Sequence, residues 1–207
     1  MKKLIAILLA VTCALALVSC SPTNTKPNGD GTAKGDLSLF TNALKTVSPK
    51  TSTVRTTLTS DLGTLNGTFE ISYAGDDRAT VAYEVEQFNE IDDTTADTDF
   101  EPKSTKKGTI TYEDGKYTTS DGVTREFALA TELKLNLDAE KMTYSIEDGN
   151  TTLKATVESK NTKDVLGTQI DAEVVLTVKR NSTTITSVTI SYTTKAGTAT
   201  IVCDYNS

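Results

Sequence analysis

Residues 184–205 read TITSVTISYTTKAGTATIVCDY, and this stretch decides the fold class. Apolar and polar residues alternate with a period of two on both sides of Lys195-Ala196-Gly197. The apolar positions are Val188, Ile190 and Tyr192 before the turn and Ala199, Ile201, Cys203 and Tyr205 after it. Because successive side chains of a strand point to opposite faces of a sheet, the pattern predicts two antiparallel strands with one buried face.

The same period recurs through most of the chain after residue 50. Residues 54–86 contain three alternating segments, and further ones lie at 110–112, 117, 133–137, 142–146, 153–157 and 170–178. Asp-Gly, a strong hairpin signal, occurs between these segments at 114–115, 121–122 and 148–149. About a fifth of all residues are threonine, whose branched β-carbon suits strands. We therefore predict a mainly β (α+β) fold, with one large antiparallel sheet formed by a single domain over residues 36–207.

One helix is predicted before the first strand. Asp36 is placed to cap it, and Pro49 ends it. The apolar positions that recur at helical spacing on one face are Leu37, Phe40, Leu44 and Val47. We expect this helix to pack on the sheet. Two later segments interrupt the strands: 161–167 fits one helical turn, and 123–132 fits either a helical turn or a loop.

The first twenty residues have the features of a bacterial export signal. Lys2 and Lys3 precede an uncharged run from Leu4 to Val18, which is shorter than the roughly 20 apolar residues of a membrane span. The run ends in Leu17, Val18, Ser19 and Cys20, and these four residues resemble the lipobox of bacterial lipoproteins. The resemblance implies that residues 1–19 are a signal peptide and that the Cys20 thiol carries lipid. The alternative is plain secretory cleavage, with Cys20 an ordinary residue.

The anchor and the segment after it set where the domain lies. Two or more acyl chains, at about 0.8 kcal/mol per buried methylene, hold a protein firmly on a bilayer. Residues 21–35, SPTNTKPNGDGTAKG, contain no apolar residue except Ala33. With Cys20 they read as a lipidated cysteine and flexible tether, 20–35, which spans on the order of 20 Å. We expect an extracytoplasmic, lipid-anchored protein at the cell membrane.

Charge and composition exclude several classes of function. The formal net charge is −7, which argues against nucleic acid as a partner and against electrostatic docking on anionic lipid. Histidine is absent, so the commonest general base and metal ligand is missing. Cys203 would be the one thiol of the mature chain besides Cys20, and its place in a strand predicts a small core residue. We predict no catalytic residue, no metal site, no cofactor and no enzymatic activity.

Three other groups of residues could carry chemistry, and each has a simpler interpretation. Ser104 and Lys107 satisfy Ser-x-x-Lys, but the partner motifs of a penicillin-binding fold are missing. Asp92, Asp93, Asp97 and Asp99 lack the glycine and distal glutamate of a calcium loop, and they lie in an interruption, 89–107, that is long for a hairpin loop. The third group, Tyr73, Tyr83, Tyr112, Tyr144 and Tyr192, falls on predicted strands, where tyrosine is common before it is a ligand-stacking ring.

The order of the predicted segments resembles the bacterial lipoprotein-carrier fold: a lipobox, a tether, a single helix and a long series of strands. Its members include the periplasmic lipoprotein chaperone, its outer-membrane receptor and mycobacterial lipid-carrying lipoproteins. The matching segments are 36–47, 54–85 and 184–205; a Met-rich or Trp lining is missing. The resemblance implies a curved half-barrel sheet that holds a lipid or other apolar ligand. The alternative is a structural or protein-interaction module of the cell envelope with a closed β core and no ligand cavity.

Overall fold

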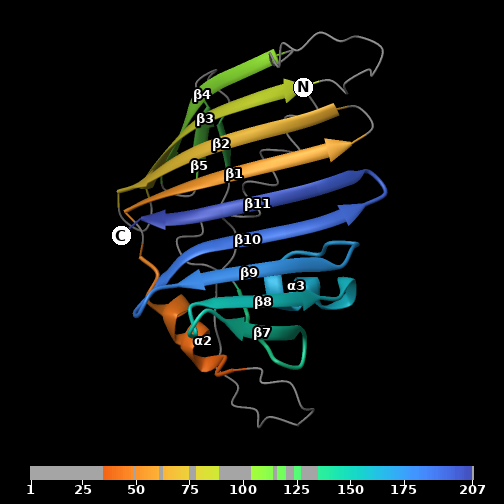
Figure 1. Cartoon of the computed structure of the whole chain (residues 1–207). Coiled ribbons are helices and arrows are strands. Elements are labelled where there is room, and N and C mark those ends of the chain that lie inside the picture. Colours follow the sequence, from red (N-terminus) through yellow and green to blue (C-terminus); the bar gives the residue numbers. More distant parts are fainter. Residues whose placement is uncertain are drawn as a thin grey trace. The chain divides into compact units, whose positions relative to one another are not determined.

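The computed structural model describes residues 35–48, 50–60, 63–74, 78–88, 104–113, 116–119, 124–126 and 135–206. Within them the structure has eleven strands, and every strand pair with an assigned register is antiparallel, which confirms the mainly β, antiparallel class (Figure 1). The signal peptide, Cys20 and the tether up to residue 34 lie outside these residues. No helix in the described ranges is long and apolar enough to cross a bilayer.

The chain divides into two compact units. Unit 1 takes residues up to 48 and 130–188, and unit 2 takes 49–129 and 189–207. The predicted single domain over 36–207 stays a prediction.

The elements that the structure describes in unit 2 are all strands, joined by turns. They are β1 (Thr51–Ser60), β2 (Gly63–Tyr73), β3 (Arg78–Phe88), β4 (Ser104–Glu113), β5 (Lys116–Thr119), β6 (Thr124–Glu126), β11 (Gly197–Asn206) and the second half of β10 (Ile185–Thr194). Their order is β6-β5-β4-β3-β2-β1-β11-β10. Figure 1 shows β11 beside β1, and Val54 of β1 lies opposite both Phe69 of β2 and Cys203 of β11.

Unit 1 combines strands with short helices. It contains α2 (Ser38–Lys45), β7 (Thr143–Glu147), β8 (Thr152–Val157), the 3-10 turn η1 (Ser159–Asn161), α3 (Thr162–Leu166), β9 (Val174–Arg180) and the first half of β10. The strand order is β7-β8-β9-β10. Its core contains the fully buried side chains Phe40, Leu135, Leu153, Val157, Val165, Leu166, Val174 and Leu176.

The helix α2 lies inside the predicted N-terminal helix, 36–47, but it is shorter, and Leu37 rather than Asp36 is its N-cap residue. Asp36 lies just before it, and its carboxylate accepts a hydrogen bond from the backbone N–H of Ser38 at 3.0 Å. Bonds from the Ser38 side chain and backbone lower the pKa of Asp36. Phe40 is buried completely, and the Arg180 guanidinium lies 5.7 Å from the centre of its ring. This cation–π contact joins α2 to β9. Pro49 lies outside the described residues.

One predicted strand, at 133–137, and the start of another, at 170–178, differ from the structure, and α3 explains both differences. Leu135 and Leu137 are buried as alternation predicts, but they form no strand, because the backbone N–H of Asn136 bonds to Val165 of α3. Ile170 and Ala172 precede β9 rather than belonging to it. The backbone N–H of Ile170 donates to the Thr162 hydroxyl, which draws this segment to α3 instead of a strand.

Other interruptions are resolved in part. The helical turn predicted at 161–167 is confirmed by η1 and α3. Residues 124–126 of the ambiguous segment form β6, and 104–107 of the predicted long loop belong to β4. The rest of both segments, including the four aspartates Asp92 to Asp99, lies outside the described residues.

Two glycines in turns differ in the space around them. Gly197 opens β11 with φ +134°, and a Cβ there would lie 2.0 Å from the backbone oxygen of Thr59. Gly149 lies in the β7–β8 turn with φ +65°, and a Cβ there would meet nothing within 4 Å. At Gly197 both the positive φ and a steric clash disfavour a side chain. At Gly149 only the positive φ does.

We expect Gly197→Ala to lower the free energy of unfolding by at least about 3 kcal/mol, because backbone strain and the clash with β1 act together. Gly149→Ala is the matched control and is expected to cost about 1–2 kcal/mol, from the left-handed backbone alone. Urea denaturation of both variants measures the difference. Equal losses would contradict the close approach of β11 to β1.

Candidate functional site

One face of unit 2 collects apolar side chains from five strands. They are Val54, Phe69, Ile71, Ala79, Val81, Val85, Ile110, Tyr112, Ala199, Ile201 and Cys203, and none is more than 8% exposed. We call this set the apolar face of unit 2. The strand register places these side chains on one face. In one row across the sheet, Cys203 lies opposite Val54, Val54 opposite Phe69, and Phe69 opposite Tyr83 at the edge of the set. The rings of Phe69 and Tyr83 stack with centroids 6.3 Å apart.

Hydroxyl groups interrupt this face at one end. Ser52 is 2% exposed, and its Oγ lies 3.1 Å from the phenol oxygen of Tyr73 in a hydrogen bond that either group can donate. Tyr205 lies opposite Ser52 on β11. Burial raises the pKa of Tyr73, of Tyr205 and of the Cys203 thiol, the last to about 12. All three groups are therefore neutral at physiological pH.

A second hydroxyl on β1 lies deeper in the face. Thr56 is 3% exposed, and its Oγ1 has no hydrogen-bond partner in the described part of the chain. Opposite it lies Gly67, where a Cβ would be 2.7 Å both from this oxygen and from Cε2 of Phe69. The missing side chain at Gly67 is what lets the Phe69 ring and the Thr56 hydroxyl both lie close to this position.

Ion pairs of unit 2 stand away from this face. Arg55 pairs with Asp204, Arg78 with Glu113, and Lys107 with Glu84. Every Lys and Arg side chain that the structure describes in unit 2 is exposed, so solvent screening leaves these pairs with little effect on stability. The apolar face has no buried charge of either sign among the described residues.

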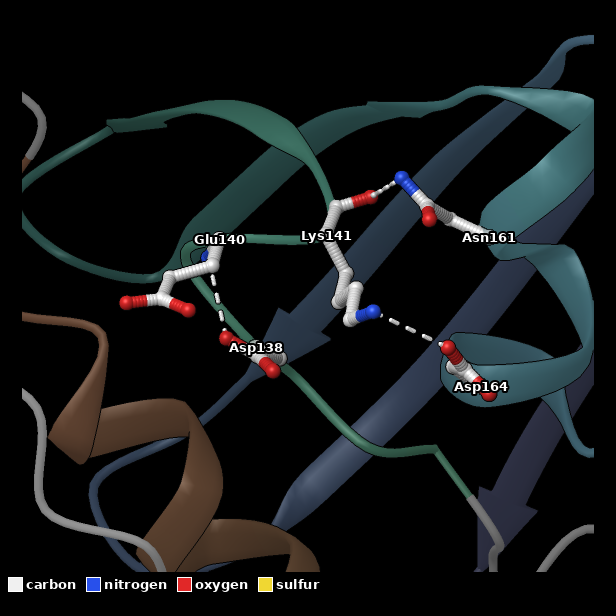
Figure 2. A network of polar contacts seen from close by, with 5 residues as sticks. All are labelled: Asp138, Glu140, Lys141, Asn161 and Asp164. Carbon is white, nitrogen blue, oxygen red and sulfur yellow. Dashed lines mark hydrogen bonds and ion pairs between the residues drawn. The ribbon is translucent and has the colours of Figure 1, made fainter.

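A polar network in unit 1 is a second group of converging side chains (Figure 2). Lys141 extends toward Asp164 of α3, with Nζ 3.2 Å from Oδ2, and the Asn161 amide donates to the Lys141 carbonyl at 3.1 Å. Asp138 accepts from the backbone N–H of Glu140 at 2.9 Å. The ion pair joins the segment 135–142 to α3, the Asn161 bond joins it to η1, and the Asp138 bond lies within the segment. Among the described residues no three metal-ligating side chains come together.

The structure places the other predicted site residues as follows. Cys203 is buried, which confirms a small core residue, and the five tyrosines lie on strands. Ser104 and Lys107 are both exposed on β4, where Lys107 pairs with Glu84 rather than with Ser104. The lipidation site Cys20 and the lipobox residues Leu17, Val18 and Ser19 lie outside the described residues.

Sequence reasoning missed Ser52 and Thr56. Both occupy positions of β1 that share the parity of Val54 and Leu58, so the period of two assigns them to the apolar face. The sequence signal for both was a polar residue at a position where the period of two predicts an apolar one.

Comparison with solved structures gives distant likenesses of fold. The crystal structure of LprF from Mycobacterium bovis is similar to this chain with a TM-score of 0.40 and 10% sequence identity, over 81% of this chain and 90% of that one. No protein-family model matches the chain. A search of curated proteins gives no significant match.

We expect Cys203 to resist iodoacetamide at pH 8 until the protein unfolds. With Cys13 and Cys20 changed to serine, Cys203 is the remaining thiol. Burial raises its pKa from 9.0 to about 12, and the thiolate is the reactive form. Mass spectrometry of labelled protein, with and without urea, measures the reaction. Rapid labelling of the folded protein would contradict a buried thiol.

The same shift predicts how stability depends on pH. The pKa of the Cys203 thiol is higher in the folded than in the unfolded protein. The neutral thiol therefore makes its full contribution to the free energy of unfolding below pH 9, and this contribution is lost as the pH rises toward about 12. Comparing this protein with Cys203→Ala isolates the thiol from other titrating groups. The difference in unfolding free energy between the two should narrow above pH 9.

Proposed function

We propose that this chain is a non-enzymatic lipoprotein, anchored at the extracytoplasmic face of a membrane through lipid on Cys20. The sequence Leu17-Val18-Ser19-Cys20, after a basic start and an uncharged run, supports the anchor. The absence of histidine from the sequence and the burial of Cys203 support the lack of catalysis. The acidic net charge favours covalent lipid over electrostatic attraction as the means of membrane attachment.

We further propose that the folded part binds a lipid or other apolar ligand on a curved, half-barrel sheet. The observation that carries this is the apolar face of unit 2. Five strands contribute to it, and no helix of that unit packs on it among the described residues. The side chains of this face are at most 8% exposed, so a ligand would take the place of the layer that shields them from water.

A second function has its own support. Phe69, Ile71 and Val54 are at most 1% exposed, which is what a conventional protein core shows. In that case the domain is a structural or protein-interaction module of the cell envelope, with no ligand in its interior. The two functions differ in whether lipid accompanies the protein.

Purification without detergent from cells that export the Cys20→Ser variant tests ligand binding. Organic extraction followed by mass spectrometry should recover a lipid in a fixed molar ratio, because no covalent acyl chain is then present to carry over membrane lipid. The matched sample is the same variant unfolded in urea, refolded and extracted again, which should be lipid-free. A monomeric, soluble protein that never yields lipid would favour the interaction module.

The anchor has a separate test. We expect the unaltered chain to incorporate radiolabelled palmitate and to sediment with membranes, and Cys20→Ser to lose both properties. Cys13→Ser is the control, since it removes a thiol that precedes the expected cleavage site and should leave labelling unchanged. Palmitate on the Cys20→Ser protein would show that the lipid lies elsewhere.

A further inference from the structure

Three Asn-x-Thr sequences lie in the described part of the chain, and the structure distinguishes them. They are Asn66-Gly67-Thr68, Asn150-Thr151-Thr152 and Asn181-Ser182-Thr183. In exported proteins this tripeptide, with any residue except proline in the middle, is the acceptor for N-linked glycosylation on surface turns and loops. Which of the three can accept a sugar depends on the backbone and the side-chain amide at each position.

Asn66 and Asn181 are both held by the fold. Asn66 lies inside β2, a strand that is paired with β1 on one side and with β3 on the other. The side-chain oxygen of Asn181 accepts hydrogen bonds from the backbone N–H groups of Thr183 and Thr184, both at 2.9 Å. It also accepts one from the Thr183 hydroxyl at 3.2 Å. The amide and the threonine of this last tripeptide are therefore bonded to each other.

Asn150 differs from both. It is exposed in the turn between β7 and β8, and its side-chain amide has no hydrogen bond to another described residue. Only its backbone is bonded: the N–H donates to the Glu147 carbonyl, and the Arg180 guanidinium donates to its own carbonyl, each at 3.1 Å. The turn is open around it, since a Cβ on the neighbouring Gly149 would meet nothing within 4 Å. The structure thus presents this amide to solvent without a competing bond.

The threonine of this tripeptide limits when a sugar can be added. Thr152 is the first residue of β8, it is 6% exposed, and it pairs with Glu147 of β7 and Lys179 of β9. The tripeptide requires its hydroxyl residue, so the enzyme must contact Thr152 as well as the Asn150 amide. Burial of Thr152 prevents this in the folded hairpin. The tripeptide is therefore accessible as a whole only before β8 has paired.

We propose that Asn150 is a site of N-linked glycosylation, modified during export before the β7–β8 hairpin closes. The donor is an oligosaccharide joined to a polyprenyl pyrophosphate. The amide nitrogen of Asn150 forms a bond to the anomeric carbon of the sugar, the bond from that carbon to the pyrophosphate oxygen breaks, and the proton lost from the amide goes to the released pyrophosphate. This rests on the proposed export of the chain and does not depend on lipid binding. In the described sheet β7 is a terminal strand, so a glycan beside it would hinder pairing with a second chain.

Peptide mass spectrometry tests the assignment. The full chain is produced in a bacterium that carries an oligosaccharyltransferase and its polyprenyl-pyrophosphate-linked oligosaccharide, and the membrane fraction is digested with trypsin. The three asparagines fall in separate tryptic peptides, 56–78, 142–154 and 181–195. We expect the mass of the oligosaccharide on 142–154 and on neither of the others. Asn150→Asp should lose it, because aspartate tolerates the left-handed backbone (φ 71°) but has no amide nitrogen.

Thr152 supplies a matched pair of variants. Thr152→Val removes the hydroxyl with little change in shape and should abolish the modification, whereas Thr152→Ser keeps the hydroxyl and should retain it. The order of events has its own measurement. A synthetic peptide of residues 142–154 should be modified by the purified enzyme faster than the folded protein, because its hydroxyl is not buried.

The outcomes separate this inference from the proposed function. A palmitate-labelled chain without sugar on 142–154 overturns the glycosylation of Asn150 and leaves the anchor standing, whereas a chain that is not exported overturns both. Sugar that persists on Asn150→Asp or Thr152→Val, or that appears on another peptide instead, overturns the assignment to Asn150. A folded protein modified as fast as the peptide overturns the order of events.

Discussion

The pairing of β1 with β2 on one side and β11 on the other determines unit 2. Side chains alternate along a strand, so a slip of one residue would exchange the two faces of the sheet. Val54, now between Phe69 and Cys203, would then give way to Arg55, whose guanidinium is bound to Asp204 on the exposed face. Burying that cation without its partner costs several kcal/mol, which makes the register strongly specified. The charge-free apolar face is a consequence of this register.

Unit 1 excludes water by different means. Its strands are covered by α2, by α3 and by the segment 135–142, each contributing only a few apolar side chains. Short elements such as these gain little from helix formation itself, so their position depends on specific contacts. The cation–π contact of Arg180 with Phe40 and the ion pair of Lys141 with Asp164 are such contacts. Unit 2 therefore depends on strand register, and unit 1 depends on side-chain contacts between separate segments.

The sequence allowed the class of fold and most strands to be predicted, because a period of two survives in β1, β2, β3, β8 and β11 without knowledge of the partner strands. It failed at Leu135 and Ile170. There, alternation comes from contact with a short helix, and a pattern that records only burial cannot distinguish a strand from an extended segment beside a helix. The candidate site was missed for a related reason. Ser52 and Thr56 look like ordinary strand formers until the register shows that they face inward.

The junction of β1 with β11 also has a kinetic meaning. Val54 and Cys203 are about 150 residues apart in the chain, so unit 2 has a high contact order. Loop-closure entropy must be spent before such distant contacts stabilise anything, and β1 has only one of its two neighbours until β11 becomes available. During synthesis the early strands are left with an open edge, the condition that favours aggregation. The threonines and the single charge, Arg55, on the opposite face of β1 then protect a nascent chain that cannot yet finish folding from aggregation.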